Sequence, residues 1–532
     1  MSWRVRRAAN GRGHSKFDQS PPARSVAARP KRTRRLSLEG LEERTVLAGL
    51  VNIEIFPNNA DGFLTLTGDG SNNQVEIRQT ANPNEFHVSS PDSTLFQING
   101  AGVTVPEATI NGIVNQIAVN LGDGNDNFSF LGIDDDNPSN VPANLEIMNQ
   151  DGSNTNLVSN VIVNGDLRVT KAGGSSGYAE LRIVNSTVIG DTIIDNFGGG
   201  TGDSRTVVDN SSLHAGGGDR RALWISNAEG NNITEVQGQS QLGTGSFLDP
   251  TDPIVSINNS GGGSRTSFTG AGQVAGPGTT TVYGKLEINN GTNLPGLLDI
   301  VTFNSTNVLG HVMIHNGHGD TESVVTDTTL GSHLVVDDPQ IGGPVEIRNE
   351  NGFDSLRITD STMPWGLFVD NAYSSPDTNW GSDTTIINSS IGEHPFGPTL
   401  DNDGDALQII GDNAKDEVLL DQTRLGGTLN LSELYNGNNV VSILNSSAMA
   451  ALYFQGGIGD DTVTIDNSQI VVAVEIMLDQ GEDTLTLSNV DLVTQWPDPL
   501  LGLIDIDGGD GVDTTNTDAL LAGALGFEEI LP

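Results

Sequence analysis

The segment at residues 437–488 decides the fold, because it repeats itself every 22 residues. It consists of GNNVVSILNSSAMAALYFQGGI at 437–458, GDDTVTIDNSQIVVAVEIMLDQ at 459–480 and GEDTLTLS at 481–488. The glycines that open equivalent turns are Gly437, Gly459 and Gly481, and the residues that begin the alternating apolar strands are Val441, Val463 and Leu485. A repeat of this length is typical of a parallel β-helix, in which each coil buries its apolar face against the next.

Looser copies of the same pattern occur through the preceding sequence. Each has an apolar pair, Asn or Asp, Ser or Thr, and a second apolar strand, as in IVNSTVIGDTII from Ile183, VVDNSSL from Val207 and RITDSTM from Arg357. We therefore predict an all-β chain whose residues 113–513 form a right-handed parallel β-helix with two strands per coil. The Asn and Ser residues after each strand should stack at the turns and bond to their equivalents in the next coil.

The two ends of the sequence depart from this pattern. Alternating strands separated by short polar turns between Phe63 and Asn99 favour an antiparallel meander, so residues 49–112 are predicted to be an antiparallel β cap. Residues 514–532 lose the strand pattern and are predicted to form a C-terminal cap, either a helix or a hairpin. Residues 1–48 are Arg-rich and contain several prolines, which predicts a disordered basic leader.

Charge and composition exclude several classes of function. Residues 1–50 hold 12 of the 25 basic residues against four acids, a formal +8, which leaves −51 for the remaining 482 residues. A body with this much negative charge repels nucleic acid and attracts cations. No nucleic-acid partner is therefore expected. The absence of cysteine excludes disulfides and thiolate sites, and no apolar stretch is long enough for a transmembrane helix.

The end of the basic segment, RRLSLEGLEERTVLAG at 34–49, has a recognisable pattern. It resembles the LExLExR-type N-terminal segment of large exported surface proteins of planctomycete bacteria. The matching residues are Leu38, Glu39, Leu41, Glu42, Arg44, Val46 and Leu47. This resemblance implies export to the cell surface or beyond, with the leader removed near Ala48. The alternative is a short amphipathic helix on a disordered tail.

A second resemblance concerns the glycine-rich turns. Gly456, Gly457, Gly459, Asp461 and Val463 fill the pattern G-G-x-G-x-D-x-U, which is similar to the calcium nonapeptide of RTX-type repeat proteins. That resemblance implies weak Ca²⁺ sites built from turn carboxylates and carbonyls. The candidate metal ligands are Asp123, Asp126, Asp460, Asp461, Asp483, Asp510 and Asp513. RTX repeats run in tandem, whereas this chain has one such turn per 22 residues, so glycine–aspartate turns that only reverse the chain are the alternative.

Parallel β-helices also include polysaccharide lyases and glycoside hydrolases. Fragments resembling the polygalacturonase pattern occur at Gly317–Gly319, Arg357–Thr359, Gly459–Asp461 and Asn516–Asp518, but their order differs from that family. The basic residues of the body are scattered along the sequence, which argues against a catalytic groove. His311 and His315 would share a face of one strand about 13 Å apart, too far to hold one zinc ion.

These observations lead to one prediction and two alternatives. The chain is predicted to be a secreted or cell-surface structural and adhesion β-solenoid without enzymatic activity, with Ca²⁺ as a possible cofactor. Its expected partners are Ca²⁺ or other cations and a polysaccharide or protein of the cell surface or matrix. The alternatives are a polysaccharide lyase or glycoside hydrolase on a β-helix, and a calcium-dependent RTX-like secreted module.

Overall fold

The computed structural model describes most of the chain from residue 49 onward. The described residues are 49–56, 62–134, 136–171, 177–196, 202–216, 221–243, 253–271, 279–292, 297–331, 343–350, 352–372, 381–393, 405–448, 450–471, 473–492, 504–516 and 529–530. All of them belong to one structural unit, Leu47–Pro532. The predicted leader at 1–48 lies outside the described residues, as does most of the predicted C-terminal cap at 514–532.

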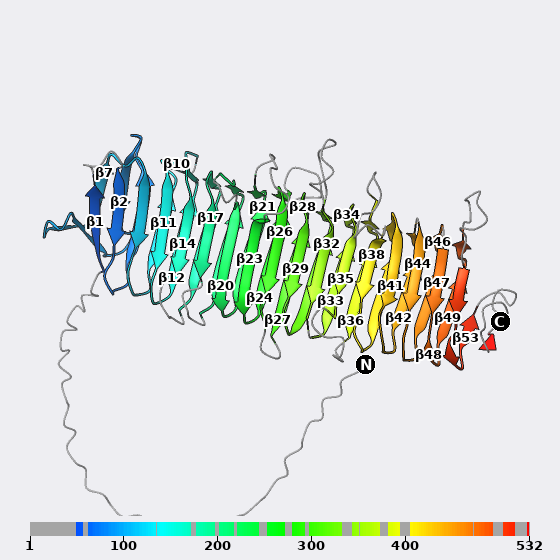
Figure 1. The fold of residues 1–532 in the computed structure, drawn as a ribbon. Helices are drawn as coiled ribbons and strands as arrows, with labels where there is room; N and C mark the ends of the chain where they lie inside the picture. The colour runs from blue at the N-terminus through cyan, green and yellow to red at the C-terminus, as the bar shows by residue number, and fades with distance from the viewer. Residues whose placement is uncertain are drawn as a thin grey trace, which may run out of the picture. The chain divides into compact units, whose positions relative to one another are not determined.

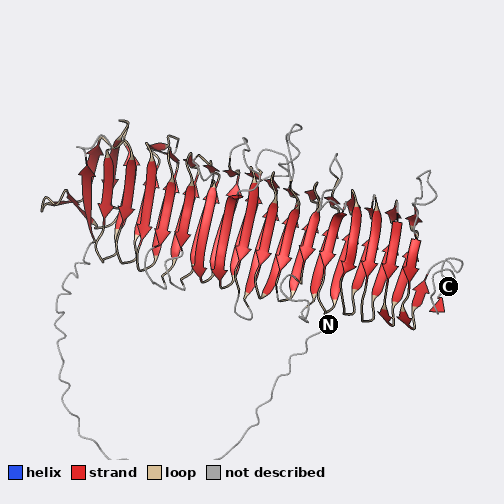
Figure 2. Cartoon of the chain, in the orientation of Figure 1, coloured by secondary structure: helices blue, strands red, loops and turns tan. Residues whose placement is uncertain are grey.

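Each coil from β8 (Gln116–Asn120) to β50 (Asp491–Leu492) contains three strands that belong to three different sheets. In one coil, β8 (Gln116–Asn120) lies in sheet A, β9 (Asn127–Leu131) in sheet B and β10 (Ser139–Val141) in sheet C. The chain then returns to sheet A as β11 (Asn144–Asn149), which pairs in parallel with β8. Figure 1 shows the sheet A strands side by side in sequence order, and Figure 2 shows strands and loops throughout the described part. The predicted all-β parallel solenoid is confirmed.

Three sets of parallel strands make up the stack. Sheet A continues from β2 (Phe63–Thr67) through β8 and β11 to β14 (Leu167–Lys171), β17 (Thr192–Asn196), β20 (Leu223–Glu229), β23 (Pro253–Gly261), β26 (Lys285–Asn290), β29 (Val312–Asn316), β32 (Val345–Asn349), β35 (Leu367–Asp370), β38 (Asp405–Ile410), β41 (Thr428–Glu433), β44 (Ala451–Gln455), β47 (Ala473–Met477) and β51 (Ile504–Asp507). Sheet B consists of β3 (Gln74–Gln79), β9, β12 (Asn154–Ser159), β15 (Ala179–Val184), β18 (Ser204–Asp209), β21 (Asn232–Gly238), β24 (Ser264–Gly270), β27 (Leu298–Asn304), β30 (Asp320–Thr326), β33 (Asp354–Thr359), β36 (Ser382–Ile387), β39 (Asp416–Asp421), β42 (Val440–Leu444), β45 (Thr462–Asp466), β49 (Thr484–Ser488), β53 (Thr514–Asn516) and β54 (Glu529–Ile530). Sheet C consists of β10, β13 (Val161–Val163), β16 (Thr187–Val188), β19 (Ser212–Leu213), β22 (Gln241–Leu242), β25 (Thr280–Val282), β28 (Thr306–Val308), β31 (Thr329–Leu330), β34 (Thr362–Met363), β37 (Ser390–Ile391), β40 (Arg424–Leu425), β43 (Ser447–Ala448), β46 (Gln469–Ile470) and β50 (Asp491–Leu492). A further short pair joins β48 (Gln480–Gly481) to β52 (Asp510–Gly511).

The repeat at residues 437–488 has the predicted register, but the predicted number of strands per coil was wrong. Val441 pairs with Val463, and Val463 pairs with Leu485, in sheet B. The sequence pattern indicated two strands per coil, whereas the structure has three. Sheet C was missed because its strands are only two or three residues long, as in β13 and β16, and follow directly after a corner residue.

The corner between sheets B and C explains the recurring Asn-Ser pattern. Asn467 takes a φ of 48°, a left-handed conformation that asparagine tolerates better than most residues. The Asn467 side chain donates to Asn445 Oδ1 of the preceding coil at 2.8 Å. The serine that follows is buried, and the Ser446 N–H donates to Ser468 Oγ at 3.2 Å. The predicted stacking of Asn and Ser from coil to coil is confirmed at this corner.

A second row of asparagines lies inside the stack, at the end of the sheet A strands. Each side-chain amide donates to the Oδ1 atom of the next member at 2.8 Å. The members of this asparagine ladder, all buried, are Asn196, Asn227, Asn259, Asn290, Asn316, Asn349 and Asn371. The ladder satisfies polar groups that would otherwise be costly in the interior.

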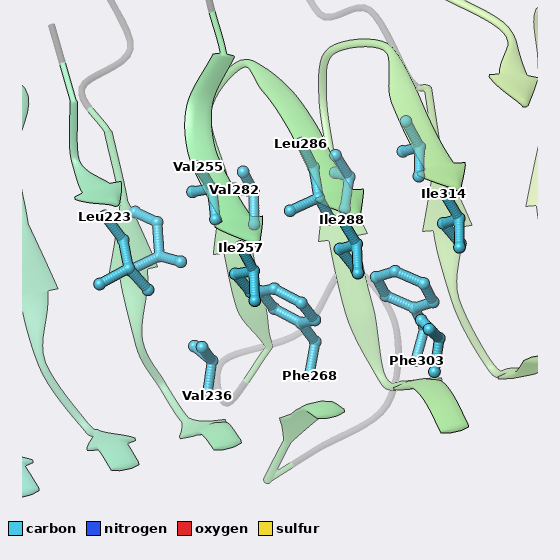
Figure 3. Packing of buried hydrophobic residues seen from close by; sticks show 14 of the residues in the cluster. Leu223, Val236, Val255, Ile257, Phe268, Val282, Leu286, Ile288, Phe303 and Ile314 are labelled. Atoms are coloured by element: carbon cyan, nitrogen blue, oxygen red, sulfur yellow. The ribbon is translucent and has the colours of Figure 1, made fainter. Parts of the chain in front are cut away.

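The apolar core runs along the inside of the coils. Ile225, Ile257, Ile288 and Ile314 form one column in sheet A, since each pairs with the next. From sheet B, the rings of Phe268 and Phe303 stack with centroids 5.4 Å apart (Figure 3). Like residues therefore contact their own counterparts, as the repeat requires.

The N-terminal cap contains antiparallel pairs, as predicted. β1 (Leu50–Phe56) pairs antiparallel with β2, β4 (Glu85–Ser89) lies antiparallel between β3 and β7 (Glu107–Asn111), and β5 (Leu95–Ile98) pairs antiparallel with β6 (Thr104–Val105). However, β2 and β3 also pair in parallel with β8 and β9. In addition, β1 pairs in parallel with β5. The stacking of whole coils thus begins at Phe63 rather than near residue 113, because the turn between β2 and β3 is a corner between two sheets and not a hairpin. The described residues contain no helix long and apolar enough to cross a bilayer.

Candidate functional site

The candidate metal ligands occupy the corner between sheets A and B, where they fall into three columns. Asp126, Asp461, Asp483 and Asp513 immediately precede sheet B strands and are all buried. Asp460 lies one residue earlier and is exposed. Asp123 and Asp510 lie three residues before the buried column and are also exposed. The structure therefore separates the seven residues by depth, which the sequence pattern did not distinguish.

The buried column bonds each coil to the one before it. Asp461 Oδ1 accepts the Asn439 N–H at 2.7 Å, and Asp483 Oδ1 accepts the Asp461 N–H at 2.7 Å. Asp513 Oδ1 accepts the Asp483 N–H at 3.2 Å, and Asp126 Oδ1 accepts the Asn73 N–H at 2.7 Å. One oxygen of each carboxyl group is thus already used as a structural acceptor.

The space opposite two carboxyl groups of this buried column is too small for any residue other than glycine. A Cβ atom on Gly456 would lie 2.0 Å from Asp461 Oδ2, and one on Gly411 would lie 1.9 Å from Asp416 Oδ2. Both distances are far below a van der Waals contact, so any side chain would displace the carboxyl group. At these two corners, the buried aspartate therefore fits only because the residue five positions before it is glycine.

Burial changes the protonation of this column. Desolvation raises the pKa of Asp461 to about 8, that of Asp126 to about 7 and that of Asp483 to about 6, although backbone hydrogen bonds oppose the shift. Two further members that the sequence analysis did not select, Asp354 and Asp416, have pKa values raised by burial to about 8 and about 7. A carboxyl group kept protonated by its surroundings is a poor calcium ligand, because Ca²⁺ binds the ionised form.

The second oxygens of these buried groups are enclosed. Within the described part of the chain, Oδ2 of Asp126, Asp354, Asp461 and Asp483 is buried and has no hydrogen-bond partner. An ionised oxygen in that position would be costly, which agrees with the direction of the pKa shifts. Asp354 and Asp461, whose pKa values burial raises to about 8, are therefore expected to be largely protonated near pH 7 and to hold the coils together as neutral groups.

An exposed hollow near the C-terminal coils brings other acids together. It has a volume of about 560 Å³ and is lined by Gly457, Ile458, Asp479, Gln480, Asp507, Gly509 and Asp510. Of the seven predicted ligands only Asp510 lies here, and the other two acids, Asp479 and Asp507, were not among the predicted ligands. Over the residues that the structure describes, no three or more His, Asp or Glu side chains are arranged to hold a metal ion. The hollow therefore offers acidic groups but no ready ligand set, and calcium binding stays a prediction.

Three of the four polygalacturonase-like fragments do not come together, and the fourth, Asn516–Asp518, lies mostly outside the described residues. His318 lies in the corner after β29, where its Nε2 atom is 3.3 Å from Glu350 Oε2. Arg357 lies on the outer side of β33 in sheet B and is exposed. Asp460 lies several coils further along the stack, beyond β39 and β42. No single groove can include all three groups.

Charged side chains do cluster on the outer side of sheet A across β26, β29 and β32. His311 Nε2 lies 3.1 Å from Glu346 Oε1, and Arg348 Nη2 lies 3.1 Å from Glu346 Oε2. Lys285 Nζ lies 3.6 Å from Glu287 Oε2. The hydrogen bond from His311 lowers the pKa of Glu346 against the effect of burial. The basic residues are scattered along the sequence, as stated above, but the register of β26, β29 and β32 brings some of them onto neighbouring strands.

These features define a three-sheet parallel β-solenoid with acidic corners and a mixed-charge patch on sheet A. Comparison of the chain with protein-family models, with curated proteins and with solved structures finds no match.

Proposed function

We propose that this chain is an exported structural and adhesion β-solenoid of the cell surface or matrix, rather than an enzyme. The main support is the use made of its polar side chains. The asparagine ladder, the buried corner aspartates and the Ser and Asn residues of the other corner all bond one coil to the next. Hydrogen bonds of this kind between coils support the proposal that the chain is a stiff scaffold with a long exposed surface.

The proposed location rests on the sequence at residues 34–49, which resembles the N-terminal segment of exported planctomycete surface proteins. The acidic body agrees with an exposed, well-solvated surface protein. Protease treatment of intact cells that produce the full chain tests this location. We expect the body to be cleaved or released in intact cells, and a variant lacking residues 1–48 to be protected inside them. Equal protection of both chains would contradict export.

Calcium stabilisation is proposed as a secondary property, supported by the three aspartates that line the C-terminal hollow. A site with a Kd of about 1 mM would add about 1.4 kcal/mol of stability at about 10 mM Ca²⁺. We expect Ca²⁺ to raise the Tm of the chain, and Asp510→Asn with Asp479→Asn to abolish the rise. NaCl at equal ionic strength is the control. An unchanged Tm in Ca²⁺ would remove this proposal and with it the RTX-like alternative.

A glycan-cleaving activity is the second candidate, favoured by the patch across β26, β29 and β32. Glu346 has a lowered pKa, whereas burial raises the pKa of Asp370 in the neighbouring strand β35. Two carboxyl groups with opposite shifts are what an acid–base pair requires. A reducing-end assay on a panel of polysaccharides, with Glu346→Gln and Asp370→Asn as variants, tests it. If the parent chain releases product and neither variant does, the enzyme is favoured over the scaffold.

A further inference from the structure

A hollow interrupts the outer side of sheet A near the N-terminal end of the stack. It has a volume of about 220 Å³ and is lined chiefly by Thr65, Ala118, Asn120, Glu146, Met148 and Arg168. These residues come from four neighbouring strands, β2, β8, β11 and β14, and lie outside the corners discussed above.

The hollow exists because one member of an outward column is short. Thr65 pairs with Ala118, Ala118 with Glu146, and Glu146 with Arg168, so that these four side chains point outward from successive coils. Ala118 has only a methyl group, whereas Glu146 and Arg168 on the following coils are long. The gap over the methyl group is therefore one coil wide along the stack. It is bounded by the side chains of Thr65 and Glu146 on the two neighbouring coils.

The walls of the hollow combine an apolar floor with a polar rim. The floor consists of the Ala118 methyl group and the Met148 side chain, which is 43% exposed. Asn120 is fixed at one side, because its Oδ1 accepts from Gln150 Nε2 at 3.0 Å and its Nδ2 lies 3.6 Å from Met148 Sδ. The rim therefore presents groups that are already oriented, which reduces the entropy cost of binding.

The charges at the rim favour an uncharged ligand. Glu146 supplies a carboxylate, and Arg168 supplies a guanidinium that also pairs with Asp166 at 3.2 Å. Because the body of the chain is strongly acidic, its field disfavours polyanions such as nucleic acid or uronic-acid polymers. A ligand with one apolar face and a ring of hydroxyl groups would cover the floor and bond to the rim, and a sugar ring has this chemistry. The volume, below that of a typical drug-sized site, suits one ring.

The same outward column continues beyond the hollow. Arg168 pairs with Ile193, and Ile193 pairs with Trp224 of β20. The Arg221 guanidinium lies 3.9 Å from the centre of the Trp224 ring, and the indole N–H donates to Ser226 Oγ at 3.1 Å. Successive coils present the outward side chains of this column about 4.8 Å apart. A polymer lying along the column would meet a new outward side chain at each coil.

We propose that the outer side of sheet A from β8 to β20 binds a neutral, linear polysaccharide, with one sugar ring seated over Ala118 and the chain continuing toward Trp224. This inference rests on the proposed adhesion function and names its ligand class and surface. Ala118, Asn120, Glu146 and Met148 hold the ring, and Arg168 and Trp224 contact the following units.

Affinity electrophoresis of the purified chain tests the proposal directly. The probes are galactomannan, hydroxyethylcellulose and soluble starch as neutral polymers, with alginate and polygalacturonate as acidic counterparts. We expect at least one neutral polymer to retard the chain and neither acidic polymer to do so. Retardation by the acidic polymers alone, or by none of the probes, would overturn the proposal.

Variants locate the binding on this face. Ala118→Phe fills the hollow, and Trp224→Ala removes the aromatic ring, so each should weaken binding of the retarding polymer at least tenfold. Thr464→Phe, an outward position in β45 of sheet B, is the matched control and should bind as the parent chain does. A Tm measurement shows that each variant is folded. Parent-like binding by both folded sheet A variants would contradict the proposal. The surface-location experiment on intact cells is independent, so failure of this inference leaves the proposed location standing.

Discussion

Asp460 and Asp461 are consecutive residues whose carboxyl groups bond to the coils on opposite sides. Asp460 Oδ1 accepts the Glu482 N–H of the following coil at 2.9 Å. Asp461 Oδ1 accepts the Asn439 N–H of the preceding coil at 2.7 Å. The Asp-Asp pair of this corner therefore joins three coils.

The two aspartates should differ in their contribution to stability. Asp461→Ala leaves the Asn439 N–H buried without its acceptor, which should lower the free energy of unfolding by about 1–3 kcal/mol. Asp460→Ala removes an exposed bond that water replaces, so it should cost less than about 1 kcal/mol. Denaturant unfolding of the two variants measures both values. Equal losses would show that burial of this column has been misassigned.

The stability of the chain should rise as the pH falls from alkaline to mildly acidic values. Burial raises the pKa of Asp354 to about 8 and that of Asp416 to about 7, whereas an unfolded aspartate has a pKa of about 4. Because the folded state favours the protonated form, the stabilisation is complete below about pH 4 and is lost as pH rises toward 8. Thermal unfolding between pH 5 and 9 should show this decrease.

A substitution separates this effect from the general repulsion of an acidic chain. Asp354→Asn keeps the acceptor for the Thr321 hydroxyl, which donates to Asp354 Oδ1 at 2.8 Å, but it cannot ionise. Its Tm should therefore depend less on pH than that of the parent. Glu322→Gln, an exposed position in β30, which pairs with β33, should keep the parent slope. Identical slopes for all three proteins would be inconsistent with a titrating Asp354.

A substitution in the middle of the asparagine ladder should lower the free energy of unfolding more than a substitution at its end. Asn290 accepts from Asn259 and from the Ser264 hydroxyl and donates to Asn316. Asn290→Ala therefore breaks three buried hydrogen bonds and should cost about 2–4 kcal/mol. Asn371 ends the ladder, where its Nδ2 atom has no partner among the described residues, so Asn371→Ala should cost less. Urea titrations of both variants make the comparison. A larger loss at Asn371 would argue against a continuous ladder.

Corner glycines should tolerate substitution according to what lies opposite them. Gly456→Ala would place a Cβ atom 2.0 Å from Asp461 Oδ2 and should destabilise the chain by about 1–3 kcal/mol. Gly70 belongs to an equivalent corner, but a Cβ atom there would have no heavy atom within 4 Å. Gly70→Ala should therefore leave the Tm unchanged or slightly higher. If Gly456→Ala is equally harmless, the corner does not enclose the aspartate as described.

The stacking of the coils could be predicted from the sequence where the coils have equal length. The asparagine ladder could not be predicted, because the coils that contain it differ in length. Residues 437–488 contain no insertion, so Val441, Val463 and Leu485 stand at a constant spacing and their stacking follows directly. In the ladder the spacing varies, with 33 residues between Asn316 and Asn349 but 22 between Asn349 and Asn371. Insertions of variable length between coils therefore hid the ladder.

The candidate site was harder to predict because neighbouring aspartates look alike in sequence. Asp460 and Asp461 both follow a glycine turn, yet one is exposed and the other is buried. The side that a corner residue faces depends on the path of the backbone, which an apolar pattern does not encode. The patch around Glu346 was missed for another reason, since its members are adjacent only through the register of β26, β29 and β32.

Cysteine cross-linking of β45 to β49 tests the stacking of like segments most directly, since the chain has no cysteine of its own. Thr462 pairs with Thr484, and Thr464 pairs with Thr486. Cysteines at either pair should lie within disulfide range, whereas the crossed pair Thr462 and Thr486 should be about 8 Å apart and should not close. The account predicts disulfides in both direct pairs and none in the crossed pair. Oxidation of the crossed pair without the direct pairs would contradict the parallel solenoid.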